Sequence, residues 1–201
     1  MAIVFPEHFD LARIEKARVF SKAAHTAAGN IRKFTNTDYH HHPESVVAIL
    51  MHVPGVTENM VIAAYLHDVL EDTKVKRRHI FEEFGFEVLQ LVLGLTDISI
   101  AADGTREIRK MIDRAHLAGQ NIDVKNIKVA DLIHNGKDIV NKDAGFAKIF
   151  IPEMELVLAV MTEADPDLLK IALKIPKDYH SAIRNVEKQR KQKQEAAANV
   201  S

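Results

Sequence analysis

The chain has 201 residues, of which 47% are apolar and 27% are charged, and it contains no cysteine. These proportions are ordinary for one globular domain, and the lack of cysteine excludes disulfides, thiolate metal sites and cysteine nucleophiles. The net charge of −1 argues against a general nucleic-acid-binding protein, which is usually strongly basic. The sequence has neither an apolar run of the ~20 residues that span a bilayer nor a secretion signal, so we expect a cytoplasmic protein without a membrane partner.

Apolar residues recur at helical spacing along most of the chain, and few segments alternate with the period of a strand. Gly136 and Pro176 are among the residues expected to end helices. The pattern predicts an all-α fold of about eight to ten helices, without βαβ order or an internal repeat. In chain order the predicted helices span about residues 8–28, Pro43 through Leu50, Thr57 through Glu71, 77–84, 86–95, 105–118, 123–135, 146–163, 166–174 and 177–196.

The C-terminal segment 177–201 differs from the rest of the chain in being mildly basic and rich in Gln, Lys and Ala. We interpret it as a solvated helix end that is either part of the same domain or frayed, in preference to a nucleic-acid-binding arm. The predicted organisation is therefore one helical domain over residues 1–176, followed by this charged segment.

Four ionisable residues, His67, Asp68, Glu71 and Asp72, interrupt the apolar segment Ala64–Thr73. On one continuous helix, the i, i+4 spacing would stack His67 with Glu71 and Asp68 with Asp72. Three carboxylates and an imidazole would then meet at one end of a buried helix, where they repel one another unless a cation or protons neutralise them. A solvated helix end would explain any one of these residues, but the four together favour a site.

Two further segments carry side chains that could complete such a site. The run His40-His41-His42 lies directly before a helix, and Asp131 and Asn135 lie at i, i+4 on another apolar helix. One of these histidines, the His-Asp pair and the distant Asp make a mixed set of nitrogen and oxygen ligands. Such a set suits Mn²⁺, Fe²⁺ or Zn²⁺ and leaves positions for water and substrate.

The order of these motifs resembles the HD-domain metal-dependent phosphohydrolases, which are all-α. Over about residues 10–163 the pattern is similar to the hydrolase domain of Rel-type alarmone enzymes, and most of all to the small stand-alone alarmone hydrolases. The motifs that carry the resemblance are Arg32-Lys33, Tyr39, His42-Pro43, His67-Asp68-x-x-Glu71-Asp72-Thr73 and Asp131-x-x-His134-Asn135.

The resemblance implies a metal site and a catalytic pair. The implied ligands of one divalent ion, Mn²⁺ in this family, are His42, His67, Asp68 and Asp131. His42 is preferred over His40 and His41 because Pro43 follows it, and the two neighbours are interpreted as loop histidines. The pair Glu71 and Asp72 would orient and deprotonate the attacking water, or protonate the leaving 3′-oxygen.

The resemblance also implies which residues bind the substrate: Arg32, Lys33, Asn135, Arg106, Arg109 and Lys128. The first would stack on the nucleotide base with Lys33 near it, and Asn135 would help place the ribose. The other three are candidates for the phosphate groups, which need partners that stay positively charged. Lys110 is interpreted as a surface charge and Lys148 as a weaker candidate, while His25 is expected to pack under the loop of Arg32.

The implied function is hydrolysis of the 3′-pyrophosphate of the nucleotide (p)ppGpp, which gives GDP or GTP and pyrophosphate. One alternative is an HD phosphohydrolase that acts on another nucleotide, as an adenosine-alarmone hydrolase or a 5′-nucleotidase would. The other is a protein that binds the nucleotide without cleaving it, which the presence of both Glu71 and Asp72 disfavours. The sequence makes no prediction of the oligomeric state.

Overall fold

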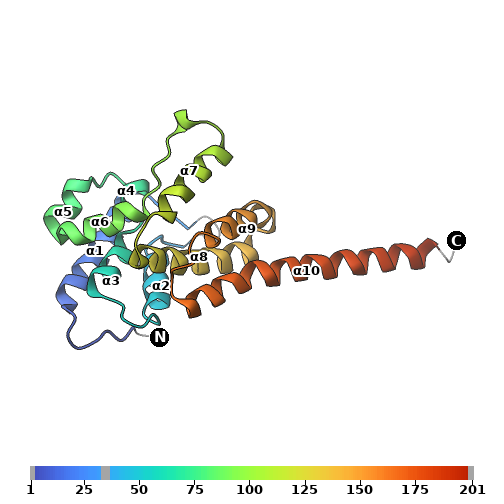
Figure 1. Ribbon diagram of the computed structural model, residues 1–201, viewed down its shortest axis with the longest axis horizontal. Coiled ribbons are helices and arrows are strands. Elements are labelled where there is room, and N and C mark those ends of the chain that lie inside the picture. Colours follow the sequence, from blue (N-terminus) through green and yellow to red (C-terminus); the bar gives the residue numbers. More distant parts are fainter. Residues whose placement is uncertain (1–2, 33–36, 199–201) are drawn as a thin grey trace.

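The computed structural model describes residues 3–32 and 37–198, and this part of the chain is all-helical, as predicted (Figure 1). The β-type pairing found within these residues is one isolated antiparallel bridge between Ile31 and Asp38. The helices are α1 (Leu11–Ala28), α2 (His41–Leu50), α3 (Glu58–Leu66), α4 (Val69–Asp72), α5 (Arg77–Phe84), α6 (Phe86–Leu95), the 3-10 turn η1 (Ala101–Asp103), α7 (Arg106–Ala118), α8 (Ile122–Lys142), α9 (Ala144–Leu158) and α10 (Pro166–Ala198).

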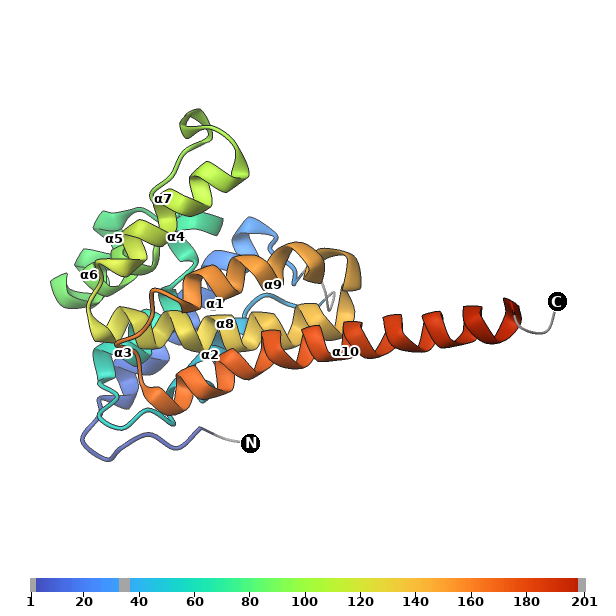
Figure 2. The same cartoon turned by 45° about the vertical axis from the view of Figure 1, so that its right-hand side comes forward.

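Helix α8 lies at the centre of the bundle and packs against α2, α3, α6, α9 and α10. Both views show it crossing the body of the molecule, with α10 along one side (Figures 1 and 2). Its residues Ile127, Ala130 and Ile133 are almost completely buried. Because Asp131 lies between them, the central helix carries a carboxylate into the core.

Side chains at the helix ends explain where several helices begin and stop. Asp10, Thr57 and Asn121 each accept a hydrogen bond from a backbone N–H in the first turn of α1, α3 and α8. Such caps satisfy N–H groups that have no partner within the helix. Gly29, at φ 72°, closes α1 in the left-handed conformation that glycine adopts without strain. The sequence predicted that this helix starts near residue 8. The cap at Asp10 explains why α1 begins at Leu11 instead.

The predicted end of a helix at Gly136 was wrong, because α8 continues to Lys142. A Cβ atom on Gly136 would lie 3.1 Å from Met154 Sδ of α9 and 3.2 Å from Ile175 Cγ2 of α10. The glycine therefore allows two neighbouring helices to approach α8 closely, and this packing keeps the residue helical despite its low helix propensity.

The predicted break at Pro176 was also wrong, since α10 is one helix from Pro166 to Ala198. A proline in the interior removes one backbone hydrogen bond. The helix continues because it packs against α8 and α9, with Leu168 and Ala172 buried in the core. Helix α9 likewise differs from its predicted range, 146–163, in ending at Leu158.

The C-terminal part of α10 extends well beyond the body of the molecule in both views (Figures 1 and 2). The predicted boundary between residues 176 and 177 falls inside this helix, and the division into a domain and a charged segment stays a prediction. Among the described helices, none combines the length and the apolar character that crossing a bilayer requires.

Candidate metal centre and active site

The helix predicted through Glu71 is interrupted at His67 and Asp68, so the prediction of one continuous helix was wrong. Helix α3 ends at Leu66, and the short helix α4 follows from Val69. His67 Nδ1 lies 2.8 Å from the carbonyl oxygen of Ala64, which a continuous helix would pair with a backbone N–H. A proton on Nδ1 therefore donates to this carbonyl, and Nε2 is the ring atom that faces Asp68 and His42.

Four side chains from three distant segments meet beside this turn, and we call them the inner cluster: His42, His67, Asp68 and Asp131. His42 Nε2 lies 3.2 Å from His67 Nε2 and 3.1 Å from Asp131 Oδ1. Asp68 Oδ2 lies 2.9 Å from His67 Nε2 and 3.7 Å from His42 Nε2. All four side chains that the sequence analysis assigned to the metal thus come together, and three of them are buried.

The charges of the inner cluster fit a cation. Burial alone would raise the pKa of Asp131, but Lys128, His42 and His67 hold it well below its usual range. Burial alone would also lower the pKa of His67, yet Asp68 and Asp131 raise it to about 9. Without a metal, the proton that His67 retains at this pKa supplies the positive charge between the two ionised carboxylates, and a bound divalent ion would take its place. The buried group of His42, His67 and Asp131 therefore indicates a divalent metal site.

Three of the four side chains of the inner cluster are also held from behind by a second side chain, and His67 is held by the carbonyl of Ala64. The Tyr39 hydroxyl donates to Asp68 Oδ2. Lys128 Nζ lies 2.9 Å from Asp131 Oδ2, and Asn135 Nδ2 donates to Asp131 Oδ1 at 2.6 Å. Such contacts fix the orientation of metal ligands and adjust their basicity. Lys128, predicted to bind phosphate, is in this structure the ion-pair partner of Asp131.

His134 is a partner that the sequence analysis named within a motif but gave no role. Its Nδ1 lies 2.8 Å from His42 Nδ1, and the two rings are 4.9 Å apart. Burial and the neighbouring His42 lower the pKa of His134 to about 4, so its ring is neutral near pH 7. With its proton on Nδ1, His42 donates to His134 and presents the lone pair of Nε2 to the inner cluster. The spacing of Asp131 and His134, i and i+3 on one helix, was the available signal.

Asn135 lies between Arg32 and Asp131 and is hydrogen-bonded to both. The guanidinium of Arg32 donates to Asn135 Oδ1 at 3.1 Å and to Asp138 Oδ2 at 2.8 Å, and it lies 5.9 Å from the centre of the Tyr39 ring. Although it is charged, Arg32 is only 7% exposed. The structure thus brings Arg32 and Asn135 together, whereas Lys33 lies outside the described residues.

The predicted catalytic pair lies on α4, directly after the turn that carries Asp68. Glu71 Oε1 accepts a hydrogen bond from the backbone N–H of Asp97 at 2.8 Å. Withdrawal from water, together with repulsion from Asp68 and Asp97, raises the pKa of Glu71 to about 7. The same two causes raise the pKa of Asp72, again with Asp68 as the repelling charge. A carboxyl group that titrates near neutral pH is suited to accept or donate a proton.

A cleft of about 120 Å³ between α7, α8 and α9 reaches Asp131 of the inner cluster and its partner Asn135. Three cationic side chains line it, Lys110, Arg114 and Lys128, together with the carboxylates of Asp97, Asp113, Asp131 and Glu153. Lys110, interpreted from the sequence as a surface charge, therefore lies at the site, where its Nζ is 2.8 Å from Asp97 Oδ2. Arg114 was missed, although its i, i+4 spacing from Lys110 places both on one face of α7.

The two residues of α7 that the sequence analysis predicted to bind phosphate, Arg106 and Arg109, do not line this cleft. Arg106 forms a bidentate pair with Glu153 of α9, at 2.7 and 2.8 Å. Arg109 is half-buried, and within the described part of the chain its Nε has no hydrogen-bond partner. The face that α7 turns toward α8 thus differs from the face that the sequence spacing suggested.

His25 is a buried histidine outside the inner cluster. It stacks on Tyr39 with ring centres 4.3 Å apart, and Asn30 Nδ2 contacts its Nδ1 at 3.0 Å. Burial and the nearby histidines outweigh the attraction of Asp68 and lower the pKa of His25 to about 4. Packing beside the segment that carries Arg32 is therefore confirmed for this residue.

Comparisons with known proteins identify the fold and the relatives of this chain. A family model of the HD domain matches residues 17–145. "Guanosine-3′,5′-bis(diphosphate) 3′-pyrophosphohydrolase MESH1" of Danio rerio is 35% identical over 104 residues, which cover 51% of this chain and 56% of that protein. "GTP pyrophosphokinase rsh" of Brucella ovis is 34% identical over 133 residues, which cover 62% of this chain and 16% of that protein.

A solved structure described as "A metazoan ortholog of SpoT hydrolyzes ppGpp and plays a role in starvation responses" superposes on this chain with a TM-score of 0.75. It is 23% identical and covers 88% of this chain and 98% of that one, so it shows a shared fold. The chain spans about half the length of MESH1 and about a sixth of rsh. The chain belongs to the HD domain family and is homologous to MESH1 and to the hydrolase domains of Rsh and SpoT proteins.

Proposed function

We propose that this chain is a metal-dependent hydrolase that removes the 3′-pyrophosphate of (p)ppGpp and releases GDP or GTP and pyrophosphate. The observation that carries the proposal is the inner cluster, with its buried mixed ligand set, next to a carboxyl group, Glu71, that titrates at about 7. The printed names of MESH1 and of the SpoT ortholog support the choice of substrate.

The proposed ligands of the metal, Mn²⁺, are the four side chains of the inner cluster. A bound divalent ion supplies Lewis acidity, which stabilises charge on a phosphoryl oxygen and makes water more acidic. Tyr39, Lys128 and His134 hold the ligands in orientation through Asp68, Asp131 and His42.

The catalytic pair Glu71 and Asp72 would move the protons. Water adds to the phosphorus atom that bears the 3′-oxygen, and the bond between that phosphorus and the 3′-oxygen breaks. The pair takes one proton from the water and returns one to the 3′-oxygen, so the products are a free 3′-hydroxyl and pyrophosphate. The raised pKa of Glu71 suits both transfers, because the group is present in both protonation states near pH 7.

The cleft between α7, α8 and α9 would bind the phosphate groups through the three cationic side chains that line it, Lys110, Arg114 and Lys128, and we add the first two to the predicted set. Arg106 and Arg109, outside this cleft, are proposed for the more distant phosphates.

The nucleoside would bind on the side of Arg32. Arg32 and Lys33 are proposed to face the base, and Asn135 is proposed to place the ribose. The hydrogen bond between Arg32 and Asn135 supports this assignment, since it links the residue proposed for the base to the one proposed for the ribose.

The test is to incubate the purified chain with Mn²⁺ and ppGpp and to measure pyrophosphate. We expect turnover in the wild type and its loss in Asp68→Asn, which keeps the shape of the side chain and removes its charge. A panel with adenosine alarmones and 5′-nucleotides separates the substrates. Binding of ppGpp to metal-loaded wild type without pyrophosphate release, or turnover restricted to another nucleotide, would contradict the proposal.

A further inference from the structure

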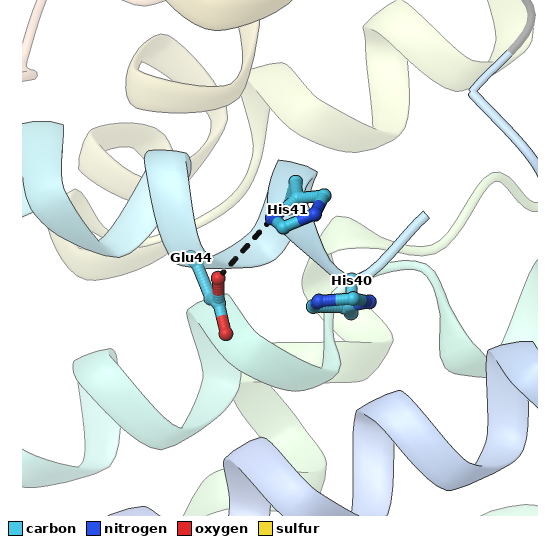
Figure 3. A group of neighbouring side chains, drawn as sticks. All are labelled: His40, His41 and Glu44. Carbon is cyan, nitrogen blue, oxygen red and sulfur yellow. Dashed lines mark ion pairs between the residues drawn. The ribbon is translucent and has the colours of Figure 1, made fainter. Parts of the chain in front are cut away.

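A second group of potential metal ligands lies at the start of α2, and we call it the outer cluster: His40, His41 and Glu44 (Figure 3). Each of the three offers one ligand atom, and these atoms all lie within 4.8 Å of one another. The sequence analysis treated both histidines as loop residues. The proposed function above uses none of the three.

The geometry of the outer cluster suits ion binding better than direct hydrogen bonding. His41 Nδ1 and Glu44 Oε2 are 3.6 Å apart, which is too long for a good hydrogen bond. Two ligands at about 2.0 to 2.1 Å from one tetrahedral ion lie about 3.4 Å apart. Figure 3 shows the His41 and Glu44 side chains facing each other, with the His40 ring beside them. The rings of His40 and His41 have centres 4.1 Å apart and are tilted by 39°.

Neighbouring side chains leave the ligand atoms available. Arg18 of α1 donates to Glu44 Oε1 at 3.2 Å, so the other oxygen, Oε2, is the one that faces His41. A ligating carboxylate whose second oxygen is hydrogen-bonded is the usual arrangement in metal sites. His40 Nδ1 lies 3.9 Å from Asp38 Oδ2, which adds a negative charge beside this ring. The positive charge of Arg18 opposes a cation, so the affinity should be lower than that of the inner cluster.

Solvent reaches the outer cluster. The side chain of His41 is 60% exposed, that of Glu44 is 32% exposed and that of His40 is 13% exposed. His41 and Glu44 also line a surface groove with Arg18 and Tyr65. Three protein ligands at an open surface leave a fourth position for water, as in zinc sites with an open coordination position.

We propose that His40, His41 and Glu44 form a second transition-metal site, of the kind that binds Zn²⁺, separate from the inner cluster. Two imidazoles and one carboxylate are a ligand set that Zn²⁺ accepts. All three ligands come from one turn of the chain, so this site depends on local structure, whereas the inner cluster depends on the packing of three distant segments.

The experiment titrates Zn²⁺ into the full chain by calorimetry, after removal of metals by a chelator and without a histidine tag. We expect two binding events per wild-type chain, and the loss of the weaker one in His41→Ala and in Glu44→Gln. Asp131→Asn should instead weaken the tighter event and retain the weaker one. His52→Ala is the matched control, because His52 is an exposed histidine outside both clusters.

The variants are expected to fold, since His41 is exposed, and an unchanged melting temperature without metal checks this. One binding event in the wild type would overturn the proposal. Two events of unchanged affinity in folded His41→Ala would overturn it as well. Neither result bears on pyrophosphate release, so failure here is distinguishable from failure of the proposed hydrolase function.

Discussion

The inner and outer clusters both use histidines of the run His40-His41-His42. Their surroundings differ in burial, in the segments that contribute side chains and in the supporting contacts. His42 is 1% exposed and meets ligands from the turn after α3 and from α8. His41, the preceding residue, points to solvent and meets a glutamate three residues later on the same helix. The comparison teaches that the residue types alone do not make a catalytic site. Burial, convergence of distant segments and supporting side chains distinguish the two.

The supporting contacts show the same contrast. Asp131 is held by both Lys128 and Asn135, and His42 by His134. In the outer cluster, Glu44 forms an ion pair with Arg18, whose side chain is partly exposed. Charges withdrawn from water interact more strongly than charges at the surface. Changes at the inner cluster should therefore have larger effects than changes elsewhere.

The largest effect is expected from the same chemical change made in each cluster. Asp131→Asn should lower pyrophosphate release by more than about a thousandfold, because the Lewis acidity of a bound ion is worth several kcal/mol. Glu44→Gln should leave the rate unchanged. The measurement is steady-state turnover of ppGpp at saturating Mn²⁺. Equal losses in the two variants would remove the distinction between the clusters.

The next largest effect concerns proton transfer. Glu71→Gln should reduce kcat by about 10²- to 10⁴-fold, the usual contribution of a general acid or base. As the base, Glu71 acts when ionised, so the wild-type rate should rise with pH through about 7. The pH profile of kcat checks this. A variant that keeps the rise near pH 7 would assign it to another group.

Much of the fold was predictable because its signals are local. The helices at 77–84 and 86–95 were predicted with the observed ends, since Gly85 separates two strongly periodic segments. Gly136 and Pro176 were misread because their roles depend on neighbours. Whether a glycine ends a helix or admits a close contact is decided by Met154 and Ile175, which lie far away in the chain.

The candidate site shows the same division. The spacing and order of motifs indicated the side chains of the inner cluster, and the structure brings them together. The contact between His42 and His134 spans 92 positions in the chain, so the i, i+3 spacing of Asp131 and His134 indicates a shared helix face but not this contact. The placement of Lys110 in the cleft, in preference to Arg106, follows from the face that α7 turns toward α8, which spacing within α7 does not determine.

A smaller effect is expected from the residue behind His42. His134→Ala should weaken Mn²⁺ binding to the inner cluster by about 10- to 100-fold, the usual cost of losing a partner of a metal ligand. Zn²⁺ binding at the outer cluster should not change. Calorimetric titration of both ions measures the two affinities separately. Unchanged Mn²⁺ affinity would show that the bond between the two histidines has no role in orienting His42.

The smallest effect on catalysis is expected from His25, a buried histidine outside the inner cluster, whose expected effect is on stability. The pKa of His67 is raised to about 9 beside Asp68, whereas burial lowers that of His25 to about 4. The unfolded chain therefore binds a proton at His25 below the usual histidine pKa of 6.5, and the folded chain does so only near 4. Stability should fall as the pH drops through this window, by up to about 3 kcal/mol from this group.

The check on this prediction is the unfolding free energy of the wild type and of His25→Gln between pH 7 and about 4. As the pH falls, the unfolding free energy of the variant should decrease less steeply than that of the wild type. Equal slopes would mean that other groups account for the acid sensitivity.

The central claim is that a divalent ion sits among the buried ligands from α2, the turn after α3, and α8. Anomalous diffraction from a crystal of the chain grown with Mn²⁺ tests it directly. We expect an anomalous peak within coordination distance of His42 Nε2, His67 Nε2 and Asp131 Oδ1. Manganese at full occupancy elsewhere, with no peak among these three atoms, would contradict it.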